Sequence, residues 1–244
     1  MQASLMITCL CDGLFPEVGK SAVRVLRKLG VTVEFPKEQT CCGQPAFNSG
    51  YPEEARKSAR AMIRAFRSSS HVVSLSGSCV GMIRHNYPRL FSGRPEEREA
   101  ETLAVKTYEF SEFLTEVLKV EALPVEVRGR ATFHNSCHTR RWLGVSDGPE
   151  KILKMVRGLE VVPLPGAEDC CGFGGTFAVK MPRISTSMVD EKVEHILETG
   201  ADLLVSLDMS CLMNIGGRLQ REAHPVRVMH LAQLLDEGWL PHGR

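Results

Sequence analysis

The sequence has 244 residues, enough for one large domain or two small ones, since about 150 residues per domain is typical. Lys and Arg number 30 against 29 Asp and Glu, so the net charge of +1 gives no electrostatic basis for binding nucleic acid or an anionic membrane. The apolar run at residues 3–10 has no basic segment before it, is followed by Asp12 and is too short to span a membrane. We therefore expect no export signal or membrane span, and a cytoplasmic protein with reduced thiols.

The first half of the chain alternates strand and helix patterns. Residues 16–29 carry apolar side chains at helical spacing and stop at Gly30, which predicts an amphipathic helix. A second helix is predicted at about 52–67, where Glu53 and Glu54 lie in the first turn. Short apolar runs predict strands at residues 5–10, 31–35 and 71–75.

The second half repeats this order of elements. Its predicted helices lie at residues 148–157 and 184–198, and its predicted strands lie at 130–135, 161–164 and 202–207. Residues 105–114 also align without gaps with residues 226–235, and each segment reads as a short strand followed by a helix. Strands that alternate with helices predict the α/β class, with parallel sheets built from βαβ units.

Eight of the nine cysteines fall into two sets of four with nearly equal spacing. Each set is centred on an adjacent pair followed by glycine. The repeat predicts two tandem, pseudo-symmetric, Rossmann-like domains at residues 1–122 and 123–244, with a surface insertion near residues 92–101 in the first copy. The sets are Cys9, Cys41, Cys42 and Cys79 in the first half, and Cys137, Cys170, Cys171 and Cys211 in the second.

Each set is expected to bind a metal group. Cys9, Cys79, Cys137 and Cys211 lie at or just beyond the carboxyl ends of predicted strands and before predicted helices, with Cys79 and Cys211 in turns. Open α/β sheets place their sites at this edge. Structural zinc prefers closely spaced cysteine pairs of the Cys-x₂₋₄-Cys type, which both sets lack. Four thiolates are the usual complement of an iron–sulfur cluster, which is the favoured interpretation. Zinc or another mononuclear metal, and redox-active or merely buried thiols, are the alternatives, and Cys11 is expected to be a free thiol.

Other residues near the cysteines have weaker signals. Gly43 and Gly172 are expected to let the backbone turn tightly beside a cluster. His134 and His138 flank Cys137 and could hydrogen-bond to the cluster or bind an anion, but an ordinary structural role fits the sequence equally well. No Gly-x-Gly-x-x-Gly motif opens a helix after a strand, so no flavin or nicotinamide site is indicated and the catalytic residues are unknown.

The cysteine motifs resemble those of a known family. They are residues 39–51 (QTCCGQPAFNSGY), 76–79 (SGSC), 134–138 (HNSCH), 170–176 (CCGFGGT) and 208–211 (DMSC). Paired cysteine-rich "CCG" domains of this kind occur in the heterodisulfide reductase B subunit, in the iron–sulfur subunit of glycolate oxidase and in the lactate utilisation protein A family. The resemblance to the lactate utilisation family is closest and covers nearly the whole chain.

One departure from the wider family affects the cofactor. Heterodisulfide reductase B subunits end each set with Cys-x-x-Cys, which supplies a fifth thiolate to an unusual non-cubane cluster. The corresponding residues here are Met82 and Asn214. The resemblance therefore implies two four-thiolate clusters, expected to be [4Fe-4S], rather than the non-cubane type.

The resemblance implies an iron–sulfur electron-transfer component of a cytosolic system that oxidises L-lactate to pyruvate and supports growth on lactate. Such a protein works with companion iron–sulfur and accessory proteins, as a subunit of an oxidoreductase rather than a complete enzyme. Two alternatives are a zinc-stabilised interaction or assembly protein and a thiol/disulfide redox subunit similar to heterodisulfide reductase.

Overall fold

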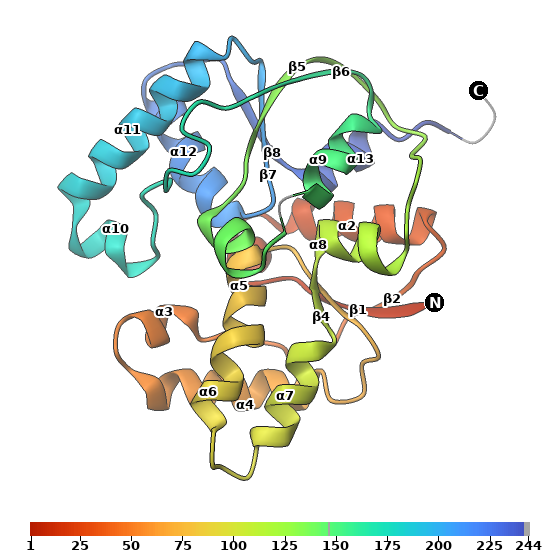
Figure 1. Cartoon of the computed structure of the whole chain (residues 1–244), viewed down its shortest axis with the longest axis vertical. Helices are drawn as coiled ribbons and strands as arrows, with labels where there is room; N and C mark the ends of the chain where they lie inside the picture. The colour runs from red at the N-terminus through yellow and green to blue at the C-terminus, as the bar shows by residue number, and fades with distance from the viewer. Residues whose placement is uncertain (146, 242–244) are drawn as a thin grey trace.

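Two four-stranded sheets form the framework of the computed structural model, which describes residues 1–145 and 147–241 (Figure 1). The strand order is β2-β1-β3-β4 in the first sheet and β6-β5-β7-β8 in the second, and all paired strands in both sheets are parallel. The predicted α/β class with two repeated parallel sheets is confirmed, whereas the boundary between residues 122 and 123 stays a prediction. The strands are β1 (Gln2–Met6), β2 (Thr32–Glu34), β3 (Val72–Ser74), β4 (Thr107–Glu109), β5 (Glu126–His134), β6 (Arg157–Val162), β7 (Leu203–Ser206) and β8 (Arg227–His230).

Helices connect the strands and cover the sheets. Helix α2 shows why they form: Pro16 starts it with a suitable fixed φ, and Val18, Ala22, Val25 and Leu26 lie along its buried face. The helices of the first half are α1 (Cys9–Leu14), α2 (Pro16–Lys28), α3 (Gln44–Asn48), α4 (Pro52–Ala65), α5 (Gly77–Gly81), α6 (Tyr87–Phe91), α7 (Glu97–Val105) and α8 (Phe110–Glu112), with π-helical turns η1 (Met82–Asn86) and η2 (Phe113–Val117).

The second half has a similar set. Its helices are α9 (Asp147–Lys154), α10 (Thr176–Lys180), α11 (Pro182–Glu198), α12 (Met209–Arg221) and α13 (Leu231–Glu237), with the π-helical turn η3 (His138–Trp142). No helix of the described residues is both long enough and apolar enough to cross a membrane.

Several predicted boundaries were wrong, above all at the cysteines. The strand expected at residues 5–10 ends at Met6, and Cys9 begins helix α1. Cys79 and Cys211 lie in the first turns of helices α5 and α12, not in plain turns. The reason is local capping, because Ser76 accepts a hydrogen bond from the Cys79 N–H and Asp208 accepts one from the Ser210 N–H.

Smaller differences concern the second sheet and the insertion. Strand β5 begins at Glu126, earlier than expected, and β6 spans Arg157–Val162 because α9 already ends at Lys154. The insertion near residues 92–101 lies partly in α7, whose Ala100 and Leu103 are buried. Within residues 92–101 only Ala100 is buried, so most of the insertion lies at the surface.

The last helices of the two halves are exchanged. Helix α13, which ends the second half, packs on α2 of the first half (Figure 1). Asp236 of α13 forms ion pairs with Arg24 (2.6 Å) and Lys28 (3.1 Å) of α2. Helix α8 and turn η2, which end the first half, contact α9 of the second half. One hydrophobic core consequently contains buried residues of both halves, including Leu5, Val25, Ile152, Leu204 and Leu234.

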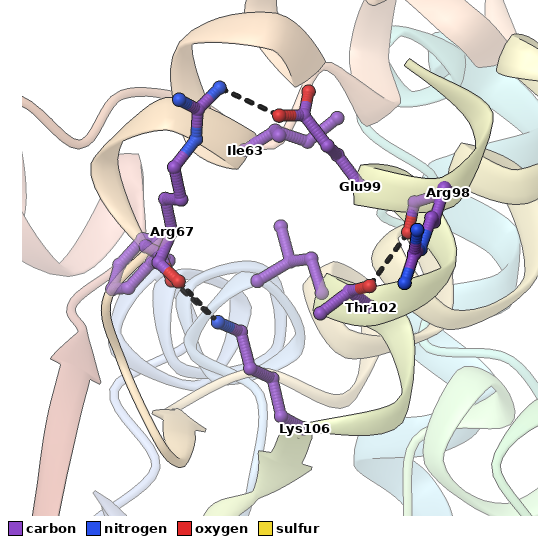
Figure 2. A pocket seen from close by; sticks show the side chains of 8 residues that line it. Ile63, Arg67, Arg98, Glu99, Thr102 and Lys106 are labelled. Atoms are coloured by element: carbon purple, nitrogen blue, oxygen red, sulfur yellow. Dashed lines mark hydrogen bonds and ion pairs between the residues drawn. The ribbon is translucent and has the colours of Figure 1, made fainter. Parts of the chain in front are cut away.

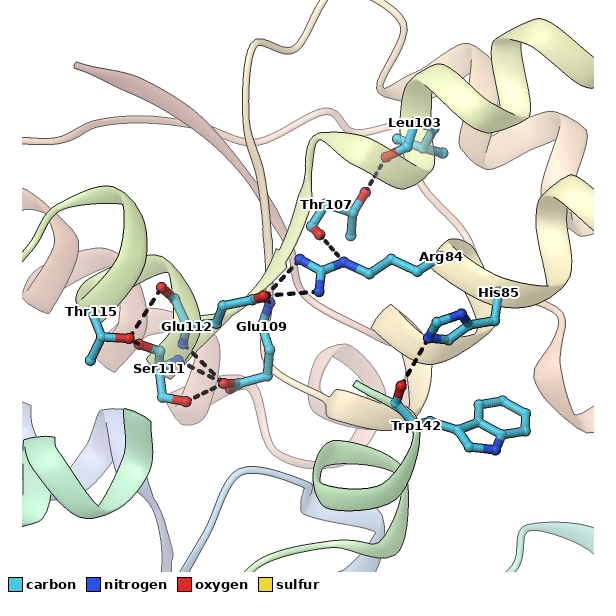
Figure 3. Close-up of polar contacts among 9 residues, drawn as sticks. All are labelled: Arg84, His85, Leu103, Thr107, Glu109, Ser111, Glu112, Thr115 and Trp142. Atoms are coloured by element: carbon cyan, nitrogen blue, oxygen red, sulfur yellow. Dashed lines mark hydrogen bonds and ion pairs between the residues drawn. The ribbon is translucent and has the colours of Figure 1, made fainter. Parts of the chain in front are cut away.

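Glu109 begins the exchanged segment of the first half. Its carboxylate accepts hydrogen bonds from the N–H groups of Ser111 and Glu112 and from the Ser111 hydroxyl, which caps α8 (Figure 3). Glu112 in turn binds both terminal nitrogens of Arg84, at 2.9 and 2.7 Å. The carboxyl group that fixes this crossing helix is itself fully buried.

Candidate metal centres at two cysteine quartets

The cysteines lie where the strand order of each sheet reverses. In the first sheet β1 is followed by Cys9 and the neighbouring β3 leads into the helix that carries Cys79. In the second sheet β5 leads to Cys137 and β7 to Cys211 in the same way. Open α/β sheets bind their ligands at this switch point, beyond the carboxyl ends of the strands.

The first quartet consists of Cys9, Cys41, Cys42 and Cys79. The Cys9 and Cys41 sulfurs are 3.7 Å apart, and those of Cys42 and Cys79 are 3.4 Å apart. The Cys41 and Cys42 side chains also interact, which joins the two pairs. The structure thus brings together all four residues predicted for the first site, from three separate segments of the chain.

The second quartet consists of Cys137, Cys170, Cys171 and Cys211. The sulfurs of Cys171 and Cys211 are 3.1 Å apart. Cys170 interacts with both Cys137 and Cys171, so these four side chains are also contiguous. The second half therefore reproduces the arrangement of the first.

The glycine after each cysteine pair shapes the loop. Gly43 and Gly172 have φ values of +84° and +80°, in the left-handed region that glycine tolerates best. Each donates its N–H to the sulfur of the first cysteine of the pair, Cys41 or Cys170, at 3.4 Å. The tight turn expected at both glycines is present.

Hydrogen bonds favour the thiolate form at one cysteine of each pair. Hydrogen bonds from the Cys42 and Cys9 side chains and from the Gly43 N–H hold the pKa of the Cys41 thiol well below its usual range. Bonds from Cys137, Cys171 and the Gly172 N–H do the same for the pKa of Cys170. Each loop thus stabilises a negatively charged sulfur, the form that binds metals.

Each quartet has a buried side and a more open side. Cys42, Cys79, Cys171 and Cys211 are buried, whereas Cys9 is exposed and Cys41, Cys137 and Cys170 are partly exposed. Four converging sulfur donors, some held as thiolates, fit a metal ion or an iron–sulfur cluster. The open side gives such a group a route to solvent or to a partner.

Cys11 lies outside the quartets. It is fully buried, and burial raises the pKa of its thiol to about 12, which keeps the thiol protonated. This agrees with the expected free thiol. Directly before Cys9, Thr8 has a φ of 70°, which is rare for a β-branched residue and marks backbone strain beside the first quartet.

The residues at the fifth-ligand positions supply no sulfur to the sites in this structure. The Met82 sulfur accepts a hydrogen bond from the Asn86 amide and is fully buried. The side-chain amide of Asn214 donates to the Cys171 carbonyl at 2.7 Å. Asn214 thus supports the backbone of the second cysteine loop.

His138 links the two halves beside the quartets. Its Nδ1 is 3.5 Å from the Cys137 sulfur, and its Nε2 is 3.2 Å from the Gln44 amide nitrogen. Burial lowers the pKa of His138, which favours the neutral ring. Because an amide nitrogen only donates, Nε2 accepts from Gln44, and the assigned Nδ1–H faces the Cys137 sulfur. Nearby, the His85 Nε2 lies 3.0 Å from the Trp142 carbonyl (Figure 3).

Asp208 is the important residue that the sequence analysis missed. One carboxylate oxygen accepts from the Ser210 N–H and hydroxyl, at 3.1 and 2.6 Å. The other accepts from the Ser76 hydroxyl (2.9 Å) and the Ser78 N–H (3.2 Å), across the interface. One buried carboxylate therefore joins the starts of the two helices that carry Cys79 and Cys211. The signal was a capping residue three positions before each cysteine.

A separate cavity lies on the first half, lined in part by Ile63, Arg67, Glu99 and Lys106 (Figure 2). It is at the amino ends of β3 and β4, so it is at the opposite edge of the sheet from the cysteines. Three of its charged groups have partners: Arg67 pairs with Glu99, and the Lys106 ammonium donates to three backbone carbonyls. The converging thiols are the better candidate site.

The chain matches known proteins over both halves. The model of the CCG family, described as "Cysteine-rich domain", matches residues 4–84 and 131–216. "Lactate utilization protein A" of Geobacillus kaustophilus (strain HTA426) is 54% identical over 237 residues, which cover 97% of this chain and 99% of the relative. "Lactate utilization protein A 1" of Bacillus mycoides (strain KBAB4) is 55% identical over 239 residues, 97% of each chain.

A solved structure supports the fold alone. The crystal structure of a hypothetical protein from Helicobacter pylori matches with a TM-score of 0.70 at 10% sequence identity. The match covers 99% of this chain and 49% of that one, so the chain spans about half the length of that protein.

Proposed function

This chain belongs to the cysteine-rich CCG family and, within it, to the lactate utilization protein A proteins, and we propose that it is an iron–sulfur electron-transfer component of a system that oxidises L-lactate to pyruvate. The system is cytoplasmic and supports growth on lactate. The chain acts in it as a subunit of an oxidoreductase, together with companion iron–sulfur and accessory proteins. The full-length similarity to lactate utilization proteins supports the pathway.

The observation that carries the proposal is the convergence of two cysteine quartets. Each quartet takes one residue after one strand, two from a loop and one from the next strand's helix, so distant segments meet at one point. Within the first loop, adjacent cysteines face different neighbours, Cys41 toward Cys9 and Cys42 toward Cys79. Four sulfurs that meet from three separate segments suit a metal group, and we propose one [4Fe-4S] cluster per half.

The protein's own residues hold and insulate such groups. A bound iron–sulfur cluster supplies the ability to take up and release single electrons. Gly43 and Gly172 stabilise the thiolates of their loops through N–H donors, and the buried cysteines keep water from one side of each site. Asp208 fixes the helices of Cys79 and Cys211 against each other, which holds the two sites in a fixed relative position.

One observation favours a second candidate, a zinc-stabilised assembly protein. The sulfur–sulfur distances of 3.4 and 3.7 Å in the first quartet are close to those within a zinc tetrahedron. Zn–S bonds of about 2.3 Å place the four sulfurs about 3.8 Å apart. This candidate has no redox role, so metal analysis separates it from the first.

The test is the iron, acid-labile sulfide and zinc content of the anaerobically purified protein, with an EPR spectrum after reduction. Two four-iron clusters predict about eight irons and about eight sulfides per chain. Zinc without sulfide would overturn the electron-transfer proposal. Disulfide reduction by the isolated chain with an artificial electron donor would support the thiol/disulfide alternative instead.

Single substitutions assign each cluster to its quartet. Cys41→Ser and Cys170→Ser should each remove about half of the iron, because each takes one thiolate from one four-iron site. Cys11→Ala is the matched control, since this buried thiol lies outside both quartets, and its iron content should stay unchanged. Full iron content in either serine variant would contradict the ligand assignment.

A further inference from the structure

The two sites differ at one structurally equivalent position. Met6 is the last residue of β1 and pairs with Ser74 of β3, three positions before Cys9. His134 is the last residue of β5 and pairs with Ser206 of β7, three positions before Cys137. The same point of the repeated fold therefore carries a thioether in the first half and an imidazole in the second.

His134 is buried beside the second quartet, where its polar neighbours are cysteine sulfurs. The residue is 1% exposed. Within the described part of the chain, neither ring nitrogen has a nitrogen or oxygen hydrogen-bond partner, and the ring interacts with the Cys211 sulfur. A ring nitrogen and the sulfurs of Cys171 and Cys211 all lie within 4.8 Å of one another.

Such an imidazole is costly unless it binds something. A buried polar group without a partner loses its hydrogen bonds to water and gains none in return. Imidazole is a common ligand of iron, zinc and copper in its neutral form. The ring lies next to two converging sulfurs. The partner that fits this position is therefore a metal that also binds sulfur.

We propose that His134 is a nitrogen ligand of the metal group at the second quartet, which makes the second site chemically different from the first. The identity of that group as an iron–sulfur cluster rests on the proposed function, but the role of His134 does not. The second site then offers five donors to a four-iron cluster, so His134 binds one iron in place of a thiolate, whereas the first site offers four sulfurs alone.

The difference sets the order in which the sites take up electrons. Replacing thiolate by neutral imidazole at an iron–sulfur cluster raises its reduction potential. We therefore expect the second site to be reduced at the higher potential, so that an electron entering at the first site moves on to the second.

Pulsed EPR of the reduced protein tests the ligand directly. The wild type should show strong ¹⁴N hyperfine coupling from a directly bound imidazole, and histidine labelled with ¹⁵N should change it in the expected ratio. The coupling should be lost in His134→Met, which copies the first site. A redox titration of the same variant should show the second signal shifted to lower potential. Unchanged coupling in His134→Met would overturn the proposal.

Two further variants guard against misassignment and misfolding. His138→Gln removes the other imidazole near the second quartet, and the coupling should persist in it. Met6→His places an imidazole at the equivalent point of the first half and should create a second coupling there. Loss of the coupling in His138→Gln would assign the nitrogen to His138 and overturn the proposal.

Iron and sulfide analysis of the same samples separates this inference from the proposed function. A wild type with clusters but without nitrogen coupling overturns the role of His134 alone. A wild type without iron and sulfide overturns the proposed function. In that case cobalt(II) bound to the thiols is the probe, and a nitrogen contribution to its spectrum that disappears in His134→Met still supports the ligand.

Discussion

Gly43 and Gly172 show how single residues shape the quartets. A Cβ at Gly172 would lie 2.6 Å from the Ser185 carbonyl oxygen, and one at Gly43 would lie 3.0 Å from the Ala55 carbonyl oxygen. Both contacts are with backbone atoms, and both positions have positive φ. The loops therefore have no room for a side chain at either glycine.

We predict that Gly172→Ala lowers the free energy of unfolding by about 2–4 kcal/mol and Gly43→Ala by about 1–3 kcal/mol, because strain from positive φ adds to overpacking. Urea denaturation measures both, and metal content should fall at the affected quartet. Gly217→Ala in α12 is the control, since a Cβ there meets nothing within 4 Å. Equal stability of the three variants would contradict this account.

At the residue scale, the cysteine repeat made all eight candidate ligands predictable. The spacing repeats because each quartet takes its cysteines from the same three segments of the repeated fold. Asp208 was not predictable, since its Ser76 and Ser78 partners are distant in sequence and meet it only through tertiary packing. His134 was singled out, but only the structure shows that it is buried beside the sulfurs of Cys171 and Cys211.

At the element scale, the stability that Glu109 contributes as the cap of α8 depends on pH. Burial raises the pKa of Glu109 to about 8, and one of its oxygens has no hydrogen-bond partner within the described residues (Figure 3). Between about pH 4.5 and about pH 8 the folded state retains a proton that the unfolded state has lost. The stability contributed by Glu109 is therefore complete below pH 4.5 and falls as the pH rises toward 8.

We predict that Glu109→Gln, which stays neutral, gains roughly 2–4 kcal/mol of stability relative to the wild type between pH 5 and pH 8. Thermal or urea unfolding at the two pH values measures the difference. Glu101→Gln, at an exposed position of α7, should follow the wild type at both. If the stability of Glu109→Gln changed with pH in parallel with that of the wild type, the Glu109 carboxyl would be ionised in the folded protein.

Long amphipathic helices were predicted well, and short helices at the cysteines were not. Helix α4 has an apolar face over four turns, so its pattern is clear in the sequence. Helix α5 has the sequence GSCVG, in which two of five residues are glycine, so neither propensity nor periodicity indicates it. Its Ser76 cap and the packing of Gly77 against Thr139 of the other half stabilise it instead.

At the scale of the whole molecule, the exchanged helices make each half depend on the other. Residues 1–122, our predicted first domain, lack α13 and so leave the buried face of α2 uncovered. Residues 123–244 lack α8 and η2, which contact α9. The alternation of strands and helices predicted both sheets, but it contains no information on which half each last helix covers.

We predict that neither half, expressed alone, unfolds cooperatively, because each exposes an apolar helix face that the intact chain buries. An equimolar mixture or coexpression should restore a one-to-one complex with cooperative unfolding. Size-exclusion chromatography and near-ultraviolet circular dichroism measure both outcomes. Sharp thermal transitions of the separate halves would identify two independent domains instead.

The exchanged helices also bear on how the two sites came to differ. Identical subunits that exchange their last helices form a symmetric dimer, in which every substitution alters both sites at once. Here the two copies are joined in one chain, and the shared scaffold persists while each copy carries its own substitutions. Met6 and His134 occupy the same point of that scaffold with different side chains. A single chain therefore allows the two sites to differ, which a symmetric pair of identical subunits does not.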